Sequence, residues 1–421
     1  MPRPASTPSR TPRDPRSPGR SIAIPPRPPP RVNFPDPLPD IRGEPREALE
    51  QRFRDWQEPA YRLGQLLDWL HARRAVSWDA MTNLPRPLRK RLAGAYSLTL
   101  PALVQVQGSG DTTRKFLWRL ADGSLVESVL IPANPALYGD RSDRHTLCIS
   151  TQVGCAYGCR FCASGLDGWK RNLLPHEISG QVLAVERWHA SQAAANRTGA
   201  PRLVNNIVVM GMGEPMANLD NVLAALRVLN APWGGQIGAR KITLSTSGVV
   251  PGIRALADDP LQFRLAISLH GATDEVRNRI MPVNRKYPLA ELRAACRYYV
   301  ERKGRMLTLE YILIEGVNAD PRQVPDLATL ARDLQAKVNL IPYNRVEGLP
   351  WERPMVAVCE AFADALRARG VPTTLRLEKG HDIDAACGQL RLRTLRDLAD
   401  TPGSSDATEA TEAIAAPGPR P

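Results

Sequence analysis

The sequence predicts an α/β fold, preceded by a small helical module and bounded by disordered ends. From about residue 146 onward, short strand-like apolar runs alternate with segments of helical periodicity. Such repeated βα units imply a parallel sheet, either doubly wound or closed into a barrel. The second observation is that both ends of the chain are rich in Pro and lack hydrophobic periodicity.

The two ends have the composition of disordered chain. Residues 1–43 are rich in Pro and Arg, and residues 396–421 contain mostly small and polar residues with several prolines. Segments with so few apolar side chains bury too little apolar surface to offset the conformational entropy that is lost on folding, so both are expected to be disordered. The prolines of the first segment also forbid the amphipathic helix of an organelle transit peptide.

Residues 44–95 are predicted to form a helical accessory domain. Leu63, Leu66, Leu67 and Leu70 recur at helical spacing, which predicts one buried face. The basic residues of this segment form either a solvated face or a contact surface for RNA.

Residues 96–140 are predicted to connect this module to the main domain through a β-hairpin. Polar and apolar residues alternate over residues 115–132, and Asp122-Gly123 supplies the turn.

Residues 141–395 are predicted to form the core domain of alternating strands and helices. The predicted strands span residues 146–150, 206–210, 241–245, 264–268, 307–314, 337–341 and 373–377. The predicted helices span residues 177–195, 221–229, 289–302, 325–334 and 356–369. Segments dense in Gly, Ser, Cys or Asn follow most of the strands, where a barrel would place its active site.

The composition favours an intracellular protein with a polyanionic partner. Lys and Arg number 56 against 43 Asp and Glu, which gives a formal net charge of +13 and a pI of about 9.7. The chain has seven cysteines but no apolar signal-peptide core, which favours a reducing compartment. No apolar run approaches the roughly 18 residues of a membrane span, so a cytoplasmic location without membrane association is expected.

Cys155, Cys159 and Cys162 predict an iron–sulfur cluster. Three thiolates within one Gly-containing loop suffice for three irons of a 4Fe-4S cluster, and the fourth iron would remain open to a substrate. A structural zinc site is the alternative, but zinc usually takes four protein ligands and no second cysteine pair lies nearby.

The chain resembles the RlmN-type radical S-adenosylmethionine enzymes, which methylate carbon 2 of adenine in RNA. The motifs that carry the resemblance are TLCISTQVGCAYGCRFC, VMGMGEPMANLDNV, ITLSTSGVVPGI, LAISLHGATDEVRNRIMPVN, LEYILIEGVN, NLIPYN and DIDAACGQL. YRLGQLLDWLH and DAMTNLPRPLR extend it into the helical module. The resemblance implies a partial (β/α)6 barrel, a 4Fe-4S cluster and two molecules of S-adenosyl-L-methionine per turnover.

The same resemblance implies the partners and compartment. These are 23S ribosomal RNA and transfer RNA as substrates, an electron donor such as flavodoxin, a monomeric state and the cytoplasm.

The resemblance also implies three catalytic residues. Cys387 matches the cysteine that carries the methyl group, and Cys148 matches the cysteine that pairs transiently with it in a disulfide to release the product. Glu127 matches the proton acceptor, although Cys148 could take the proton instead. From the residues alone, Cys387 and Cys148 could equally be buried core cysteines and Glu127 a solvated carboxylate.

Further matches imply contacts to the cofactor. Gly213 allows a close backbone approach, and Glu214 beside it can accept hydrogen bonds from the methionine ammonium. The expected cofactor contacts are Gly213, Glu214, Ser245, Ser268, Leu269, His270 and Asn344. Cys296 and Cys359 lie in helical stretches without a motif and are interpreted as packing residues.

Two other functions compete with this interpretation. A Cfr-like relative methylates carbon 8 of adenine with the same cysteines, but Asp384 and the SLHGATDEVRNRIMPVNRKY run favour carbon 2. A non-catalytic iron–sulfur RNA-binding protein would be expected to lack Cys387 or Cys148, and both are present. The Glu378-Lys379-Gly380-His381 stretch departs from many relatives and leaves the fine substrate contacts open.

Overall fold

The structure, a computed structural model, describes residues 38–109, 112–133, 142–166, 168–193 and 202–376, together with Thr394. Cys387 and the predicted tail at residues 396–421 lie outside these ranges, as do residues 1–37 of the predicted N-terminal tail.

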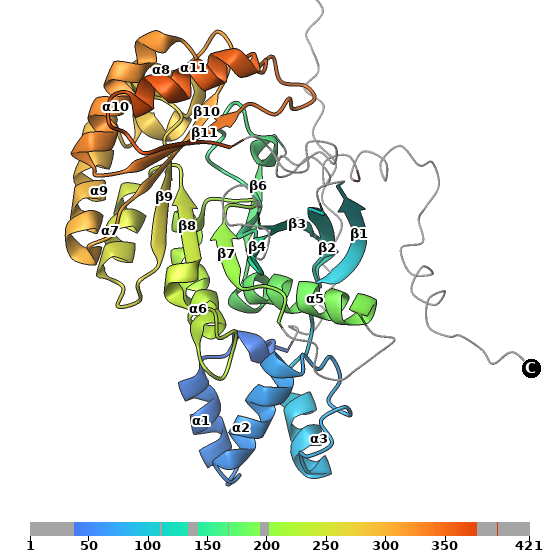
Figure 1. Ribbon diagram of the computed structural model, residues 1–421. Coiled ribbons are helices and arrows are strands. Elements are labelled where there is room, and N and C mark those ends of the chain that lie inside the picture. The colour runs from blue at the N-terminus through green and yellow to red at the C-terminus, as the bar shows by residue number, and fades with distance from the viewer. Residues whose placement is uncertain are drawn as a thin grey trace, which may run out of the picture. The chain divides into compact units, whose positions relative to one another are not determined.

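A ten-stranded sheet forms the centre of the fold, in the order β1-β2-β3-β4-β7-β8-β9-β10-β11-β12. From β4 onward every neighbouring pair is parallel. The order never reverses, whereas a doubly wound sheet reverses at a switch point. The sheet therefore has the barrel topology that was one of the two predicted arrangements. Figure 1 shows it curling, with helices on its outer side.

The strands of this sheet are β1 (Ala102–Gly108), β2 (Arg114–Arg119), β3 (Leu125–Pro132), β4 (His145–Cys148), β7 (Asn206–Val209), β8 (Ile242–Thr246), β9 (Arg264–Ser268), β10 (Thr308–Leu313), β11 (Lys337–Pro342) and β12 (Thr373–Leu375). A separate antiparallel pair, β5 (Gln152–Gly154) and β6 (Trp169–Asn172), flanks the loop that carries Cys155, Cys159 and Cys162.

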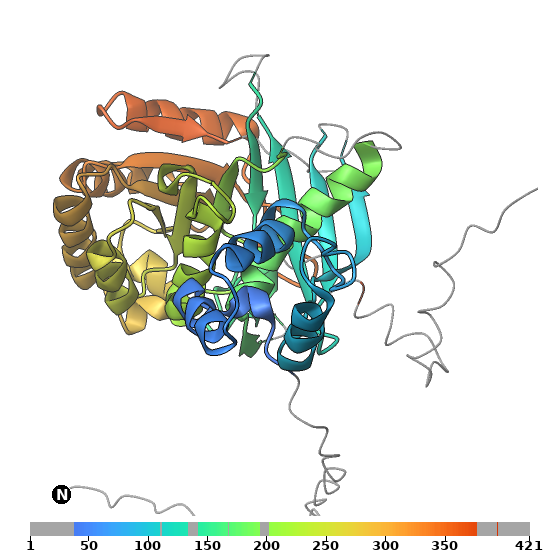
Figure 2. The same cartoon turned by 90° about the horizontal axis from the view of Figure 1, so that it is seen from below.

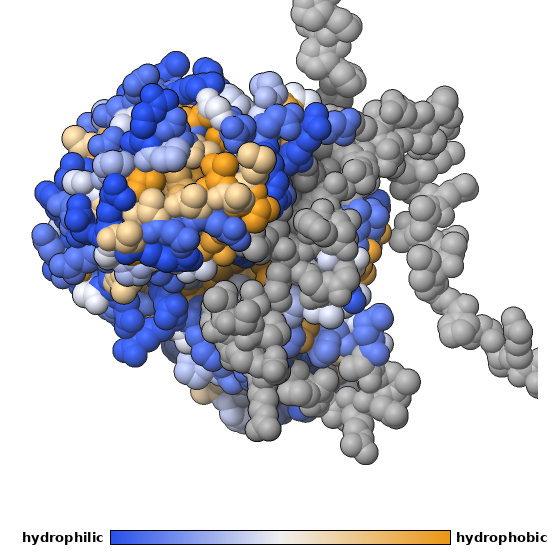
Figure 3. Space-filling model, turned by 45° about the horizontal axis from the view of Figure 1, so that its top comes forward, coloured by the Kyte–Doolittle hydropathy of each residue, from blue (hydrophilic) through white to orange (hydrophobic). Residues whose placement is uncertain are grey.

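The helices of the core are α5 (Pro175–Ala193), α6 (Leu219–Asn230), α7 (Val250–Asp258), α8 (Asp274–Ile280), α9 (Leu289–Lys303), α10 (Val324–Asp333) and α11 (Val356–Arg367). Figure 3 shows a hydrophobic patch bordered by hydrophilic residues on the face that it presents. Helices α7 and α8 were not predicted, because each is too short for its periodicity to stand out.

The predicted hairpin is confirmed, since β2 and β3 pair in antiparallel register. Its turn is held by Asp122, whose Oδ1 accepts a hydrogen bond from Ser124 N at 3.0 Å, and by Gly123 with a φ of 82°. Strand β1 continues the sheet beyond this hairpin and was not predicted. It is an edge strand whose side chains are largely exposed, so its sequence lacks a clear buried face.

The helices α1 (Arg46–Asp55), α2 (Tyr61–Leu67) and α3 (Arg86–Ala95) form a group with its own hydrophobic core. Figure 2 shows the three helices together, seen from below. Leu63, Leu66, Leu67 and Leu70 are all buried in this core, as their spacing predicts. The start of α3 lies among the prolines of LPRPL, because Pro is well accommodated in the first turn of a helix.

The helical group begins earlier than the predicted boundary at residue 44. A 3-10 helix, η1 (Ile41–Gly43), precedes α1, and Ile41 lies in the same hydrophobic core. Asp40 caps η1 by accepting from Arg42 N at 2.9 Å, and its other oxygen accepts from Thr99. The predicted disorder of residues 1–43 is therefore wrong for residues 40–43. The hydrogen bonds of Asp40 and the burial of Ile41 attach these residues to the helical group.

In the ranges that the structure describes, no helix is long and apolar enough to cross a membrane.

Candidate active site

One cavity of about 400 Å³ gathers residues from loops at the carboxyl ends of the parallel strands. Cys155, Cys159 and Cys162 all line it, as does Cys148 at the end of β4. Six of the seven expected cofactor contacts line it as well. These are Gly213, Glu214, Ser245, Ser268, His270 and Asn344. The strands therefore bring together groups that are almost two hundred residues apart in the chain.

The loop with the three cysteines is held at both ends by the β5–β6 pair. Gly154 has a φ of 76°, and a Cβ atom there would lie 1.8 Å from the carbonyl oxygen of Gly168. Cys155 N donates to that same oxygen at 3.1 Å, and Arg160 N donates to Ile280 O at 2.9 Å. The loop is thus fixed to β6 and to the end of α8, so its cysteines are held in place by backbone contacts.

The environment of these cysteines fits a bound cluster. Burial raises the pKa of the Cys155 thiol to about 12 and raises that of Cys159 well above its ordinary value, with the neighbouring cysteines contributing to both shifts. A bound cation would offset this cost of burial and favour the thiolate forms.

A single zinc ion fits this arrangement less well. Among the described residues, no group of three His, Cys, Asp or Glu side chains converges closely enough to hold one metal ion. Three cysteines that line one cavity without converging on a point suit a cluster of several irons. The residues present therefore fit a 4Fe-4S cluster held by Cys155, Cys159 and Cys162.

Glu214 is a buried carboxylate at the start of the 3-10 helix η4 (Pro215–Asn218). Its Oε1 accepts from Met216 N at 3.1 Å, and its Oε2 accepts from Ser247 N and Oγ at 2.8 and 2.7 Å. Burial raises its pKa, and these hydrogen bonds oppose the rise. The Thr246 side chain gives a further hydrogen bond, and the carboxylate lines the cavity, where it can attract a cationic group.

The backbone before Glu214 approaches β5 closely. Gly213 has a φ of 104°, and a Cβ atom there would lie 2.6 Å from the Gln152 side chain. Gln152 Oε1 in turn accepts from Glu214 N at 2.9 Å. Glycine is therefore required at position 213 because its backbone packs closely against β5, the strand that leads into the cysteine loop.

His270 is buried in a positive-φ conformation, with a φ of 55°. Its Nδ1 accepts from Ile312 N at 3.0 Å, and its ring meets Phe161 of the cysteine loop edge to face with centroids 5.0 Å apart. Burial and the charge of Arg277 lower its pKa to about 3, so the ring is neutral. The proton then lies on Nε2, which makes that atom a hydrogen-bond donor.

Ser245 and Ser268 lie on adjacent strands, with their Oγ atoms 3.2 Å apart. Leu269, the next residue after Ser268, does not line the cavity. Its side chain is buried in the core, and its N–H donates to Glu310 O at 2.9 Å. Neighbouring positions point to opposite sides of a strand, which accounts for the difference between Ser268 and Leu269.

Glu127 is buried on β3 and forms an ion pair with Lys115, whose Nζ lies 3.1 Å from Glu127 Oε2. The alternative of a solvated carboxylate is therefore wrong. Glu127 does not line the cavity itself, but it shares a face of β3 with Val129 and Ile131, which do. Val129 pairs with Cys148 on the neighbouring strand β4. Glu127 lies two residues before Val129, on the same face of β3.

Two buried charged residues near the cavity were not predicted. Glu310 of β10 lines it, and Arg277 of α8 donates to Ser247 O and Asn284 Oδ1, both at 2.9 Å. Both residues occur within the quoted motifs, and an isolated acid inside an apolar strand is a signal that could have identified Glu310. Cys296 and Cys359 are both fully buried in the hydrophobic core, as predicted.

Comparisons with known proteins identify two families in the chain. Residues 149–326 match the radical SAM superfamily, and residues 40–97 match the ribosomal RNA large subunit methyltransferase N-terminal domain.

Several proteins resemble the chain over most of their length. It is 55% identical over 367 residues to a probable dual-specificity RNA methyltransferase RlmN 3 of Opitutus terrae, which covers 87% of this chain and 98% of the relative. It is 52% identical to a probable dual-specificity RNA methyltransferase RlmN of Akkermansia muciniphila, over 85% and 96% of the two chains. A crystal structure of a radical SAM methyltransferase from Sphaerobacter thermophilus is 43% identical, with a TM-score of 0.76 over 83% and 98% of the chains.

Proposed function

The chain belongs to the radical SAM family of RlmN dual-specificity RNA methyltransferases, and from this premise we propose that it methylates carbon 2 of adenine in RNA. The observation that carries the proposal is the single cavity that unites Cys155, Cys159 and Cys162 with Cys148 and the polar residues after the strands. Cys387 completes the proposed set as the carrier of the methyl group, and it lies outside the described residues.

The chemistry requires a radical, because carbon 2 of adenine lies between two ring nitrogens and is too electron-poor to attack a methyl group as a nucleophile. A cluster held by Cys155, Cys159 and Cys162 would supply reductive cleavage of S-adenosyl-L-methionine. In this proposal, one molecule of S-adenosyl-L-methionine methylates Cys387 and a second supplies the radical, which makes two per turnover.

The residues of the cavity hold and release the reacting groups. The carboxylate of Glu214 would accept from the methionine ammonium, and the neutral ring of His270 would donate from Nε2. After carbon 2 bonds to the methylene of Cys387, the radical adduct gives up one electron, which the cluster would accept, and loses the proton of carbon 2 to Glu127 or to Cys148. The ion pair with Lys115, whose Nζ lies 3.1 Å from Glu127 Oε2, holds the Glu127 side chain in place.

Release of the product is assigned to Cys148. Its thiolate attacks the sulfur of Cys387, and the carbon–sulfur bond breaks with its electron pair going to the carbon. That carbon takes up a proton to become the methyl group, and the two cysteines are left as a disulfide. Reduction of that disulfide must precede the next turnover. The position of Cys148 on the cavity wall supports this role, because an attacking thiol must reach the adduct.

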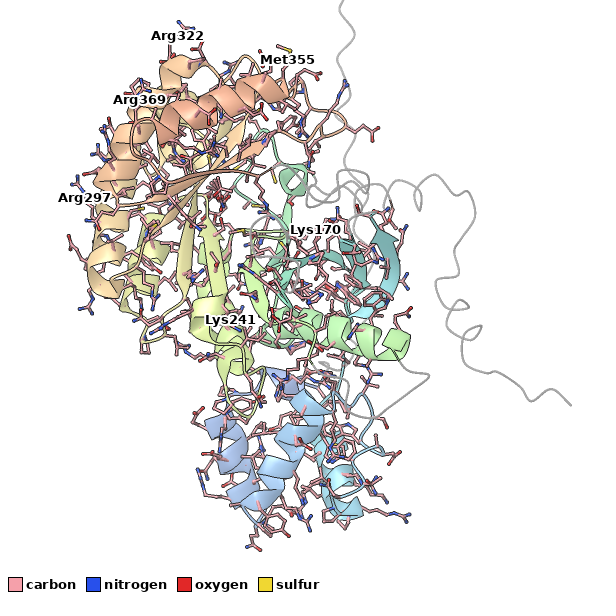
Figure 4. All side chains as sticks on the ribbon, viewed as in Figure 1. Lys170, Lys241, Arg297, Arg322, Met355 and Arg369 are labelled. Atoms are coloured by element: carbon pink, nitrogen blue, oxygen red, sulfur yellow. The ribbon has the colours of Figure 1, made fainter. Side chains whose placement is uncertain are left out.

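The proposed substrates are 23S ribosomal RNA and transfer RNA, and the names of the relatives describe those proteins as dual-specificity RNA methyltransferases. A net charge of +13 supports binding to a polyanion. Figure 4 shows basic side chains on many separate elements, among them Lys170, Lys241, Arg297, Arg322 and Arg369. Trp169 on β6 is 51% exposed beside Lys170, and such a pair suits stacking of an unpaired base.

An electron donor such as flavodoxin, a monomeric state and a cytoplasmic location complete the proposal.

Nucleoside mass spectrometry tests the function directly. The chain is expressed in a bacterial strain that lacks its own adenine-C2 methyltransferase, and ribosomal and transfer RNA are digested separately. We expect 2-methyladenosine in both pools, and about four irons per chain in protein reconstituted without oxygen. The appearance of 8-methyladenosine would assign the carbon-8 reaction, and stoichiometric zinc without iron uptake would refute the cluster.

A further inference from the structure

The cavity contains an acid that none of the proposed roles uses. Glu310 lies in the middle of β10, where its strand neighbours are Leu309 and Tyr311, and its side chain lines the same cavity as Ser268 and His270. The residue is only 6% exposed. A carboxyl group at such a position is costly to bury, so a structural role would require it to be fully hydrogen-bonded.

Among the residues that the structure describes, only one oxygen of Glu310 has a hydrogen-bond partner. Its Oε1 accepts from Asn339 Nδ2 at 3.1 Å, whereas its Oε2 is buried and accepts from none of these residues. Buried polar atoms in proteins are nearly always paired. Because Glu310 lines the cavity, a ligand bound there is the natural source of the missing donor.

The neighbours of Glu310 show which part of the cavity this ligand group would occupy. The parallel register places Glu310 between Ser268 of β9 and Asn339 of β11. Ser268 Oγ lies 3.2 Å from Ser245 Oγ, so Glu310 borders a pair of hydroxyl groups. Burial raises the pKa of Glu310, while the charges of Arg376 and Lys337 and the Asn339 hydrogen bond favour the carboxylate. Arg376 also lines the cavity.

The methionine end of S-adenosyl-L-methionine would bind in another part of the cavity, beside Glu214. Glu214 N donates to Gln152 Oε1 at 2.9 Å, and Gln152 lies on β5 just before the cysteine loop, so the methionine group would be held there. The nucleoside of S-adenosyl-L-methionine then extends along the other strands, and its ribose carries two adjacent hydroxyl groups. Each hydroxyl both donates and accepts, so a ribose can donate to Glu310 and accept from a serine hydroxyl.

We propose that Glu310 binds the ribose hydroxyls of S-adenosyl-L-methionine, with Ser245 and Ser268 as their second partners. This inference rests on the proposed function, because it assumes that the cavity binds that cofactor. Acidic residues bind ribose hydroxyls in the same way in other nucleotide sites. Glu310 is a binding residue in this scheme, and it sets the requirement for an intact ribose.

The first test varies the ligand and needs no protein variant. S-adenosylhomocysteine has the same nucleoside but no methyl group to transfer, so its binding to the cluster-loaded enzyme can be measured by calorimetry without turnover. The 2′-deoxy and 3′-deoxy analogues remove one hydroxyl each, and an N6-methyl analogue changes the adenine instead. We expect at least one deoxy analogue to bind about 10- to 100-fold more weakly. Equal affinity of both deoxy analogues and the parent would overturn the inference.

The second test couples the ligand to the side chain. Glu310→Gln keeps the size of the side chain and an oxygen for Asn339, but places an amide where the free oxygen was. We expect this variant to bind S-adenosylhomocysteine about 10- to 100-fold more weakly and to lose its discrimination against the deoxy analogue. Glu315→Gln is the matched control, because it removes an exposed carboxylate from the segment just after β10.

The outcomes separate this inference from the proposed function. If Glu310→Gln discriminates between parent and deoxy analogue as the natural enzyme does, Glu310 is not the ribose partner. If the variant instead loses affinity only for the N6-methyl analogue, Glu310 contacts the adenine and the inference fails. If the natural enzyme carries its cluster but binds neither S-adenosylhomocysteine nor S-adenosyl-L-methionine, the proposed function itself fails.

Discussion

At the scale of single residues, Arg277 connects loops that follow different strands. Its guanidinium is fully buried and donates to Ser247 O after β8, to Leu269 O after β9, and to Asn284 Oδ1 in the 3-10 helix η6 (Pro282–Arg285). These loops carry the proposed cofactor contacts. Arg277 is thus a positioning residue, because it acts on the cavity through the backbone of its neighbours.

Replacing Arg277 tests this role. Arg277→Ala leaves several buried acceptors without a donor, so we expect the free energy of unfolding to fall by about 3 kcal/mol or more. Arg277→Lys keeps the charge but loses the planar arrangement of donors, and it should recover only part of the loss. Thermal unfolding of the two variants measures the difference. An alanine variant as stable as the natural protein would show that the loops are held by other contacts.

The two proposed catalytic cysteines can be separated by what their loss leaves behind. Cys387→Ala should accept no methyl group and form no adduct, because the carrier is missing. Cys148→Ala should still be methylated and react with adenine, and then remain covalently joined to RNA because the release step is missing. Denaturing gels with and without nuclease, followed by peptide mass spectrometry, distinguish the two results.

An RNA adduct on the Cys387 variant would assign the methyl carrier to another residue. Normal turnover by the Cys148 variant would assign release elsewhere, and Glu127 would be the first residue to replace.

At the scale of elements, the β5–β6 pair determines the position of the cysteine loop. Gly154→Ala would place a Cβ atom on the carbonyl oxygen of Gly168, so we expect the pair to separate and iron loading to fall severalfold. Gly158→Ala is the matched control in the same loop. Its φ of 59° costs about 1 kcal/mol for alanine, but no atom lies within 4 Å of the added Cβ. Iron analysis after reconstitution should therefore separate the two variants, and equal loading would contradict this view of the loop.

The π-helix η2 (Asp68–Ala72), which continues α2, contains a buried histidine that makes stability depend on pH. Burial, with the charges of Arg42 and Arg202, lowers the pKa of His71 from 6.5 to about 3. The folded pKa lies below the unfolded one, so the contribution of His71 is complete above pH 6.5 and is lost as the pH falls toward 3. At pH 5 the loss is about 2 kcal/mol.

Comparison with His71→Phe measures this effect. Phenylalanine keeps an aromatic ring beside Trp233, whose centroid lies 5.5 Å from that of His71, and removes the titrating nitrogens. Denaturant unfolding at pH 7 and pH 5 should show a smaller fall in stability for the variant. Equal falls for both proteins would mean that other groups account for the pH dependence.

At the scale of the whole molecule, the positive charge is shared between residues 1–37 and the rest of the chain. Residues 1–37 are Arg-rich, but the rest of the chain remains basic, and electrostatic attraction to phosphates dominates RNA affinity. We therefore expect deletion of residues 1–37 to leave methylation largely unchanged in a nucleoside assay. Loss of methylation with retained folding would assign a function to this segment.

Asp40 marks where the deletion must stop. It accepts from Arg42 N, from Thr99 N and from Thr99 Oγ1, so Asp40→Ala should destabilise the helical group by about 1–3 kcal/mol. A thermal unfolding measurement checks this value, and an unchanged variant would show that the cap is dispensable.

The sequence by itself determined the features that depend on local order. The spacing of Cys155, Cys159 and Cys162 predicts an iron–sulfur cluster, and the alternation of apolar runs predicts most strands and helices. Both patterns can be recognised because each depends only on residues that are close together in the sequence. Motifs after successive strands also predict where polar groups gather, since parallel strands end at one edge of a sheet. The short helices α7 and α8, and the strands β1, β5 and β6, carried too little periodicity to be recognised.

The tertiary structure alone decided which side chains are buried together. The pairing of Glu127 with Lys115, the free oxygen of Glu310 and the contacts of Arg277 each depend on the register of neighbouring strands or on loops far apart in the chain. Burial and hydrogen bonding of a charged group are set by everything that packs around it, and no short stretch of sequence contains that information. The sequence therefore determines which residues are present, whereas the free energy of burying and pairing them depends on the folded barrel.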